Sequence, residues 1–281
     1  MTLEETLFED IRAGKQVDVE RALLIASGCD TEEGIADYQK KIQTLDNMFR
    51  DYREAGAVPS DALSVGKALL GFLWRNPENI DNENMFQLTS CLDAQFSKEA
   101  SEIGNCTGLS SVYGVLGVRN NLNIVVIANS RHVMPRLLVD NDKIDIESRA
   151  PNGFYIPTSY FGGIYKGLKQ KPLIFLVACA YLNRGYEKSN AKKFLEAKED
   201  YDRTLVIAPD FAEAYNNRGF AKEKLEKFEE AIADYRIAIQ IDPNCTYAYE
   251  NRGIAKRRLG DIKGAEEDFA KFREALGVLF Q

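Results

Sequence analysis

Hydrophobic residues recur every three or four positions through much of the first hundred residues, which is the period of an amphipathic helix. The period is clear in VDVERALLIASG (17–28) and in EEGIADYQKKIQTLDNMFRDYREAG (32–56), and Gly56 and Pro59 interrupt it. DALSVGKALLGFLWRNPEN carries it up to Pro77, which cannot continue a helix, and NENMFQLTSCLDAQFSKEA carries it again. We therefore predict a helical region over residues 1–100.

The pattern changes in the middle of the chain. GNCTGLSSVYGVLG predicts an apolar helix that starts at Cys106. After it, NIVVIA (123–128) is a continuous run of mostly β-branched residues, which is typical of a buried strand. HVMPRLLV (132–139) and KIDIES (143–148) follow, separated by the turn-forming DND (140–142). We expect these three strands to form a small antiparallel sheet.

The last third of the chain repeats itself every 34 residues. NRG begins at Asn183, Asn217 and Asn251, a tyrosine stands two positions before each, and an alanine follows each glycine by twelve. Small residues let two antiparallel helices approach, and the aromatic residues fill the space between them. Pro209 and Pro243 end the first two units. Such units cannot bury their apolar faces alone, so we expect them to stack.

These features resemble the tetratricopeptide repeat, in three units over residues 178–211, 212–245 and 246–279. The resemblance implies an all-α superhelix within residues 171–281, with a groove that binds a protein or peptide. Amides in the groove could hydrogen-bond a ligand backbone; alternatively, these asparagines are solvated or cap local structure. The repeat's pattern places in the groove Asn183, Asn217, Asn251, Tyr186, Phe220 and Ile254.

The same resemblance argues against one kind of partner. Relatives that bind chaperone tails clamp a C-terminal carboxylate with basic side chains. Leu182, Asn216 and Glu250 occupy the corresponding positions here. We therefore do not expect a receptor for chaperone tails.

The composition and net charge of the chain narrow the classes of partner, location and cofactor that we expect. The 281 residues carry a net charge of −7, so a nucleic-acid partner is not expected. The acidic start of the sequence leads us to expect no secretion signal. No apolar run reaches the roughly 18 residues that cross a bilayer. The five cysteines are scattered without a CxxC pair, which favours a reducing cytoplasm. The single histidine excludes a His-based metal cluster, and we expect neither metal nor cofactor.

Cys106, His132 and an acid follow one another in the order that thiol catalysis needs. The positive end of a helix stabilises a thiolate, which is the reactive form of cysteine. A histidine on a facing strand can take the thiol proton, and a carboxylate can orient its ring. The alternative is structural: free cysteine is among the most buried residue types, and a lone histidine can be a hydrogen-bonded core residue.

The register of the last two strands decides which acid can reach His132. If Asp140-Asn141 forms the turn, Glu147 pairs with Met134 and lies diagonal to His132 on the same face. If Asn141-Asp142 forms it, Glu147 lies opposite Arg136, too far away. Asp145 shares the face of Glu147 and stays a second candidate acid.

VERALLIA, GNCTGLSSVYGVL, RHVMPRL and IDIES resemble the SirB-type transglutaminase-like proteins over roughly residues 15–170. That family joins a helical N-terminal part to a papain-like core, often followed by tetratricopeptide repeats. The resemblance implies an α+β domain over residues 1–170, helical over 1–100 with the Cys/His core at 101–170. The family's catalytic positions fall on Cys106, His132 and Glu147.

Two functions follow from these features. The first is a cysteine-dependent amide hydrolase or acyl transferase, of protease or transglutaminase type, whose repeats recruit a protein substrate. The second is a non-catalytic adaptor whose papain-like core supports the repeats. Catalysis also needs hydrogen-bond donors for an oxyanion. The Cys106 N–H is one candidate, and the side chain of Gln95 or Asn105 is another.

Overall fold

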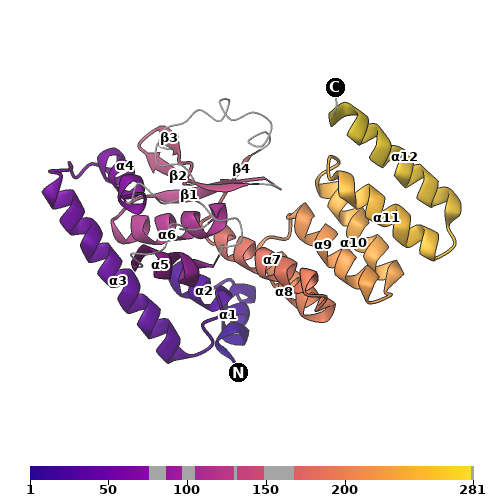
Figure 1. Cartoon of the computed structure of the whole chain (residues 1–281), viewed down its shortest axis with the longest axis horizontal. Coiled ribbons are helices and arrows are strands. Elements are labelled where there is room, and N and C mark those ends of the chain that lie inside the picture. Colours follow the sequence, from indigo (N-terminus) through magenta and orange to yellow (C-terminus); the bar gives the residue numbers. More distant parts are fainter. Residues whose placement is uncertain (76–86, 97–104, 130–131, 149–167, 280–281) are drawn as a thin grey trace. The chain divides into compact units, whose positions relative to one another are not determined.

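The computed structural model describes residues 1–75, 87–96, 105–129, 132–148 and 168–279 (Figure 1). The chain divides into two compact units, Met1–Ala180 and Tyr181–Gln281. The first holds helices α1 (Leu3–Arg12), α2 (Val19–Ala26), α3 (Glu32–Ala55), α4 (Ala62–Leu73), α5 (Leu88–Phe96) and α6 (Cys106–Arg119), and strands β1 (Ile124–Ala128), β2 (Val133–Val139), β3 (Asp142–Asp145) and β4 (Lys169–Lys171). The boundary between the two units falls within helix α7 (Phe175–Asn190). The second unit continues with α8 (Phe194–Ile207), α9 (Ala212–Lys224), α10 (Phe228–Ile241), α11 (Thr246–Arg258) and α12 (Ile262–Leu279).

Side-chain caps define where the N-terminal helices begin. Asp18, Thr31 and Asp61 each accept hydrogen bonds from backbone N–H groups in the first turn of α2, α3 and α4. Helix α1 was not among the predicted helices. It starts with a capping box, in which Thr2 and Glu5 satisfy one another's backbone N–H groups.

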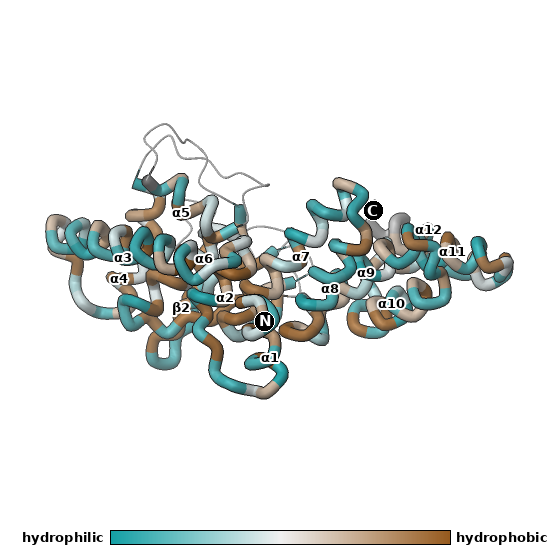
Figure 2. The backbone as a smooth tube through the Cα atoms, turned by 90° about the horizontal axis from the view of Figure 1, so that it is seen from below, coloured by the Kyte–Doolittle hydropathy of each residue, from teal (hydrophilic) through white to brown (hydrophobic). Residues whose placement is uncertain are grey.

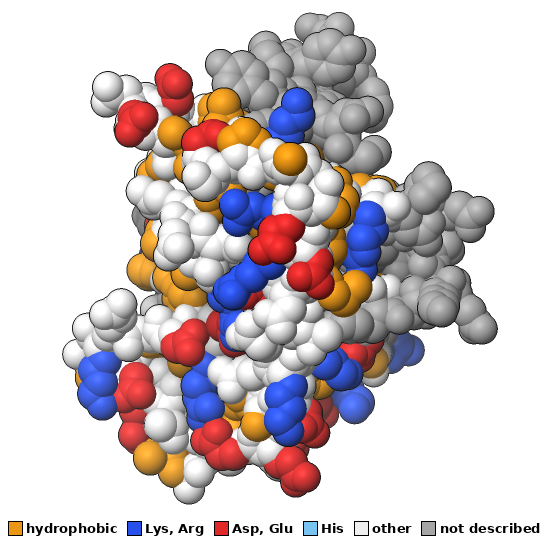
Figure 3. All heavy atoms as spheres, turned by 90° about the vertical axis from the view of Figure 1, so that its left-hand side faces the viewer, with side chains coloured by type: hydrophobic (Ala, Val, Ile, Leu, Met, Phe, Trp, Pro, Cys, Tyr) orange, Lys and Arg blue, Asp and Glu red, His pale blue; other side chains and the backbone are white. Residues whose placement is uncertain are grey.

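The long helix α3 shows why the hydrophobic period predicted these elements. Its apolar residues are buried while the rest of its surface is mostly exposed, and hydrophilic and hydrophobic colours alternate along it (Figure 2). On the side of the first unit where α3 and α4 lie, Lys and Arg side chains mix with Asp and Glu (Figure 3). In the part of the chain that the structure describes, no helix is both long and apolar enough to cross a membrane.

Helix α6 is the centre of the first unit. All residues from Thr107 to Gly117 are buried, as expected of a helix that is covered on every side. It packs against α2, α3, α4 and α5 and against strands β1 and β2. A Cβ on Gly117 would lie 2.1 Å from Ile124 Cδ1, so the glycine permits the close approach of β1. The helix therefore holds its first residue, Cys106, in a fixed position.

The sheet has the strand order β3-β2-β1-β4, with the paired strands antiparallel. Val139 pairs with Asp142, so Asp140 and Asn141 make the turn between β2 and β3. Asp140 has a φ of 50°, a left-handed conformation that Asp tolerates better than most residues. Strand β3 ends at Asp145, earlier than the predicted 148. The pattern also missed β4, because its KQK sequence is polar and its residues lie on the sheet edge.

The second unit owes its packing to the repeated small and aromatic residues. A Cβ on Gly185, Gly219 or Gly253 would lie within 2.8 Å of the ring of Tyr201, Tyr235 or Phe269. Each glycine thus faces the aromatic residue sixteen positions later, on the partner helix. The repeated alanines, among them Ala197 and Ala231, are fully buried. The described residues after 171 form helices and short connections, as the repeats predict.

Candidate functional site

Cys106 is the first residue of α6 and is half-buried. The preceding Asn105 caps the helix, because its Oδ1 accepts hydrogen bonds from the N–H groups of Thr107 (2.9 Å) and Gly108 (3.1 Å). The thiol therefore stands at the positive end of the helix dipole, which favours the thiolate. The Asn105 Oδ1 atom is occupied by these two capping hydrogen bonds.

His132 precedes β2 by one residue, and only 4% of it is exposed. Asn129 closes the connection from β1: its Oδ1 accepts from the His132 N–H at 2.9 Å, and its own N–H donates to the His132 carbonyl at 3.0 Å. The ring Nε2 lies 2.7 Å from Oε2 of Glu147, which is equally buried. The structure thus brings these two predicted site residues into direct contact.

The strand register explains why Glu147 rather than Asp145 reaches the ring. The Ile146 N–H donates to the Pro135 carbonyl at 3.0 Å, which extends the pairing beyond β3 and sets Glu147 opposite Met134. This is the first of the two registers that the sequence allows. Asp145 lies opposite Arg136 and is bound by its guanidinium through two nitrogens.

Burial lowers the pKa of His132, because it removes the imidazolium from water. The hydrogen bond with Glu147, the interaction with Cys106 and the negative charges of both groups act in the opposite direction. They outweigh burial and raise the pKa of His132 from 6.5 to about 9. Since Nε2 is bound to the carboxylate, Nδ1 is the nitrogen left to exchange a proton with the thiol. This arrangement can support a thiolate–imidazolium pair at neutral pH.

A second layer of contacts fixes the acid. Trp74 Nε1 donates to the carbonyl of Ser148, the residue after Glu147, at 2.9 Å. The Ser148 hydroxyl lies 3.2 Å from that of Ser110, one turn after Cys106 on α6. Both serines are buried, so these contacts hold the end of the β3 segment against the helix. Sequence reasoning missed them, and the one signal available was that Trp74 is the chain's single tryptophan.

Among the described residues, no group of three or more His, Cys, Asp or Glu side chains could hold an ion. None of the five cysteines forms a disulfide bond. The cluster around Cys106 is thus built from one thiol, one imidazole and one carboxylate.

The predicted groove residues of the second unit bind one another as well as facing outward. Asn251 Nδ2 donates to Asn216 Oδ1 at 3.1 Å, across two repeats, and Asn216 Nδ2 donates to Asn217 Oδ1 at 3.2 Å. Asn217 and Asn251 are therefore linked through Asn216. The sequence had named Asn216 only as a position that lacks a basic clamp residue. These amide side chains therefore hydrogen-bond to one another within the repeats.

The aromatic residues of the same helices differ in exposure. Tyr186 is 58% exposed and Tyr247 is 66% exposed, although both are large and partly apolar. Phe220 packs edge-on against Phe194, with ring centroids 6.3 Å apart, and the Lys224 ammonium lies over its ring. The helices that would line the groove thus offer exposed tyrosines beside half-buried amides.

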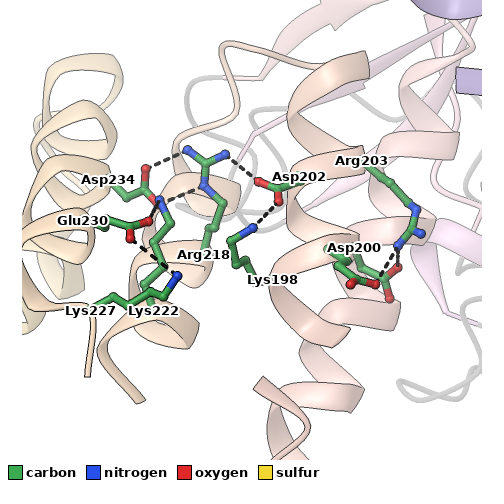
Figure 4. A network of polar contacts seen from close by, with 10 residues as sticks. Lys198, Asp200, Asp202, Arg203, Arg218, Lys222, Lys227, Glu230 and Asp234 are labelled. Carbon is green, nitrogen blue, oxygen red and sulfur yellow. Dashed lines mark hydrogen bonds and ion pairs between the residues drawn. The ribbon is translucent and has the colours of Figure 1, made fainter. Parts of the chain in front are cut away.

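Buried ion pairs join the two helices of each repeat. Arg218 binds Asp234 through two nitrogens at 2.7 and 2.8 Å and also reaches Asp202 of the preceding repeat at 2.8 Å (Figure 4). Lys222 adds a second cation to Asp234 at 2.8 Å. The same arrangement recurs with Arg184 and Asp200 and with Arg252 and Asp268. Sequence reasoning missed these pairs, although the constant spacing of sixteen residues was available as a signal.

Comparison with known protein families identifies one of the predicted repeats. Residues 212–245 match the tetratricopeptide repeat family model, with the bounds of the second predicted unit. No curated protein matches the chain.

Solved structures of TPR domains resemble part of the chain. The second TPR of Spaghetti (RPAP3), bound to an HSP90 peptide, is 31% identical over 35% of this chain and 91% of that one, with a TM-score of 0.34. The yeast Sti1 TPR2B domain in complex with an Hsp70 peptide is 32% identical over 35% and 78%, with a TM-score of 0.35. The Sgt2 TPR domain from Aspergillus fumigatus is 29% identical over 36% and 66%, with a TM-score of 0.35.

Proposed function

We propose that the first unit is a cysteine-dependent amide hydrolase or acyl transferase of the SirB-type transglutaminase-like class, and that the repeats recruit its protein or peptide substrate. The observation that carries the proposal is the 2.7 Å contact of His132 Nε2 with Glu147 Oε2, together with the electrostatic interaction of His132 with Cys106. Three residues from separate elements meet there in the order nucleophile, base and orienting acid.

The chemistry follows from these positions. The Cys106 sulfur attacks the carbonyl carbon of an amide, and the thiol proton resides on His132 Nδ1. The carbonyl π electrons move to oxygen and form a tetrahedral oxyanion. When it collapses, the C–N bond breaks, and the leaving amine takes the proton from His132. Water or a second amine then attacks the thioester carbon, and His132 accepts its proton. The C–S bond breaks, which releases the acid or the new amide and restores the Cys106 thiolate. Glu147 stabilises the imidazolium and keeps the ring oriented.

The groove supports recruitment rather than chemistry. Amide side chains at Asn217 and Asn251 can bond to the backbone of an extended peptide, and the exposed Tyr186 offers apolar contact. HSP90 and Hsp70 peptides are the ligands of the Spaghetti and Sti1 domains. Here Leu182 and Glu250 stand where an acidic tail would need cations, so we assign this groove to peptides without a clamped C-terminal carboxylate.

Site-resolved alkylation tests the catalytic part. The protein would be treated with iodoacetamide between pH 5.5 and 9, and each cysteine would be quantified by mass spectrometry. Burial raises the pKa of Cys29 and of Cys91, and raises that of Cys245 to about 11, so these thiols serve as internal controls. We expect Cys106 to react at pH 6, where an ordinary thiol is protonated.

The variants His132→Gln and Glu147→Gln should slow this reaction at pH 6 by about tenfold or more, because they remove or weaken the imidazolium partner. If Cys106 reacts no faster than Cys245 at every pH, the thiol is structural. The protein would then be the adaptor that the repeats alone suggest.

A further inference from the structure

Ser110 lies on α6, one helical turn after Cys106, and it is completely buried. A serine inside a helix commonly bonds to a carbonyl of its own helix. The Ser110 hydroxyl instead contacts two other segments of the first unit. Its Oγ lies 3.4 Å from the Val133 carbonyl oxygen and 3.2 Å from the Ser148 hydroxyl. One small side chain therefore joins the helix to both segments.

Both partners of Ser110 stand next to a candidate catalytic residue. Val133 follows His132 in the chain, and Ser148 follows Glu147. The contacts of Ser110 thus run beside the contact between the imidazole and the acid, which are 2.7 Å apart. A shift of either partner would move the adjoining catalytic side chain with it, because neighbouring residues share a rigid peptide unit.

The strand register explains how one hydroxyl can reach both partners. Arg136 pairs with Asp145 in the antiparallel ladder of β2 and β3. In the same register, Val133 and Ser148 lie opposite each other three positions further out. Ser110 bonds to both members of this pair, one step beyond the pair that contains the acid. Its side chain therefore fastens the end of the ladder to α6.

Chemistry determines the direction of these hydrogen bonds. A carbonyl oxygen only accepts, so the single hydroxyl proton of Ser110 goes to Val133. The Ser148 hydroxyl must then donate to Ser110 Oγ. The Ser148 carbonyl accepts from Trp74 Nε1 at 2.9 Å, so this residue is held through its main chain and its side chain. Since both serines are at most 1% exposed, water does not replace a lost partner.

We propose that Ser110 is a positioning residue, whose hydroxyl holds the His132 and Glu147 segments against the start of α6. It touches no reacting atom and acts through the backbone of its two partners. Without the hydroxyl, the acid should leave the imidazole more often, and the imidazolium should lose stabilisation. The inference rests on the proposed function, since this alignment serves catalysis only if Cys106 is the nucleophile.

Ser111 provides a matched control for the test. It is the next residue on α6 and is 1% exposed, and its hydroxyl donates to the Thr107 carbonyl of the same helix at 2.8 Å. Ser110→Ala and Ser111→Ala each remove one buried hydroxyl from α6. Only the first removes a link to the His132 and Glu147 segments. Circular dichroism and thermal melts of the full chain verify that each variant folds.

Two measurements report on the site rather than on stability. The first is the pKa of His132, from the single histidine Hε1 signal in a pH series of NMR spectra. The second is the rate at which iodoacetamide alkylates Cys106 at pH 6, where the sulfur displaces iodide. We expect Ser110→Ala to lower the pKa by about 0.3–1 and to slow alkylation by about two- to tenfold, as for one lost hydrogen bond. Ser111→Ala should leave both unchanged.

Ser148→Ala removes the same link from its other end, and it replaces Ser110→Ala if that variant does not fold. It retains the Ser110 hydroxyl for Val133 and releases only the segment that carries the acid. The pKa of His132 should again fall. In the double variant Ser110→Ala/Ser148→Ala the two effects should not add, because both substitutions break one shared hydrogen bond.

The outcomes separate this inference from the proposed function. If Ser110→Ala changes the two measurements no more than Ser111→Ala does, the positioning role is wrong. If alkylation slows while the pKa of His132 stays the same, the effect does not pass through the imidazole, and the role is again overturned. If Cys106 of the unmodified chain is not selectively alkylated at pH 6 but Ser110→Ala still lowers the pKa of His132, the proposed function fails and the positioning role stands.

Discussion

His132 Nε2 lies 2.7 Å from Glu147 Oε2, and this contact spans two strands joined by the Asp140-Asn141 turn. Both side chains are buried, so the imidazole is held by a carboxylate that water barely reaches. The contact assigns Nε2 to the acid and leaves Nδ1 for Cys106. Because the chain has one histidine, its titration can be followed without ambiguity.

We expect His132 to titrate with a pKa of about 9 in the folded protein. In Glu147→Gln the pKa should fall, since the carboxylate's charge no longer favours the imidazolium. The single histidine Hε1 signal in a pH series of NMR spectra measures both values. Asp145→Asn is the matched control, because that acid is bound by Arg136 and should leave the titration nearly unchanged. A wild-type pKa at or below 6.5 would contradict the geometry.

The same shift makes stability depend on pH. The folded pKa of His132 lies above its unfolded value of 6.5, so its contribution is fully present below about pH 6.5 and is lost as pH rises through about 9. Glu147→Gln should therefore be destabilised most at pH 6, by about 1–3 kcal/mol, and less at pH 9.5. Urea unfolding at both pH values measures the difference.

Arg218 offers a comparison of a buried and an exposed acid. It binds Asp234, whose side chain is 3% exposed, and Asp202, whose side chain is 40% exposed. Asp234→Asn should cost about 3–5 kcal/mol, because Arg218 and Lys222 lose a buried counter-charge. Asp202→Asn should cost less than about 1 kcal/mol, since its carboxylate is screened by water. Equal losses in chemical denaturation would mean that burial does not set the strength of these pairs.

Gly219 should not tolerate a side chain. A Cβ there would lie 2.7 Å from Tyr235 Cε1, and the ring cannot move freely because it is fully buried and its hydroxyl donates to Glu223. We expect Gly219→Ala to lower the free energy of unfolding by about 1–3 kcal/mol, despite the better helix propensity of alanine. Arg236→Ala, at an exposed position of α10, is the control. Stabilisation by Gly219→Ala in thermal melts would contradict the packing.

The amides of Asn217 and Asn251 should matter for peptide capture. A peptide would be selected from a displayed library by binding to the full chain. Its affinity would then be measured for the unmodified chain and for the double variant Asn217→Ala/Asn251→Ala. Losing two backbone hydrogen bonds of about 0.5–1.5 kcal/mol each should weaken binding by about tenfold. Asn244→Ala, in the exposed connection before α11, should bind normally, and Cys106→Ala should bind normally without turnover. If the double variant binds the peptide with unchanged affinity, the peptide binds to another surface of the protein.

Much of the second unit can be predicted from the sequence, because the residues that pack together within each repeat recur at a fixed, short spacing. Gly219 and Tyr235 recur at a fixed spacing, and helix packing converts that spacing into contact. The amphipathic period likewise predicts α2, α3 and α4, because it records which side of a helix faces the core. The same reasoning missed β4, whose polar residues pair through the backbone alone.

The sequence by itself therefore determined most of the elements, the repeat and a short set of candidate site residues, although it missed α1 and β4. It left two registers for β2 and β3, and with them the choice between Glu147 and Asp145. Only the tertiary structure decided that Glu147 binds the His132 ring and that Asp145 forms an ion pair with Arg136. Periodicity reports which side of an element is buried, whereas a hydrogen bond between distant residues depends on how the buried sides fit together.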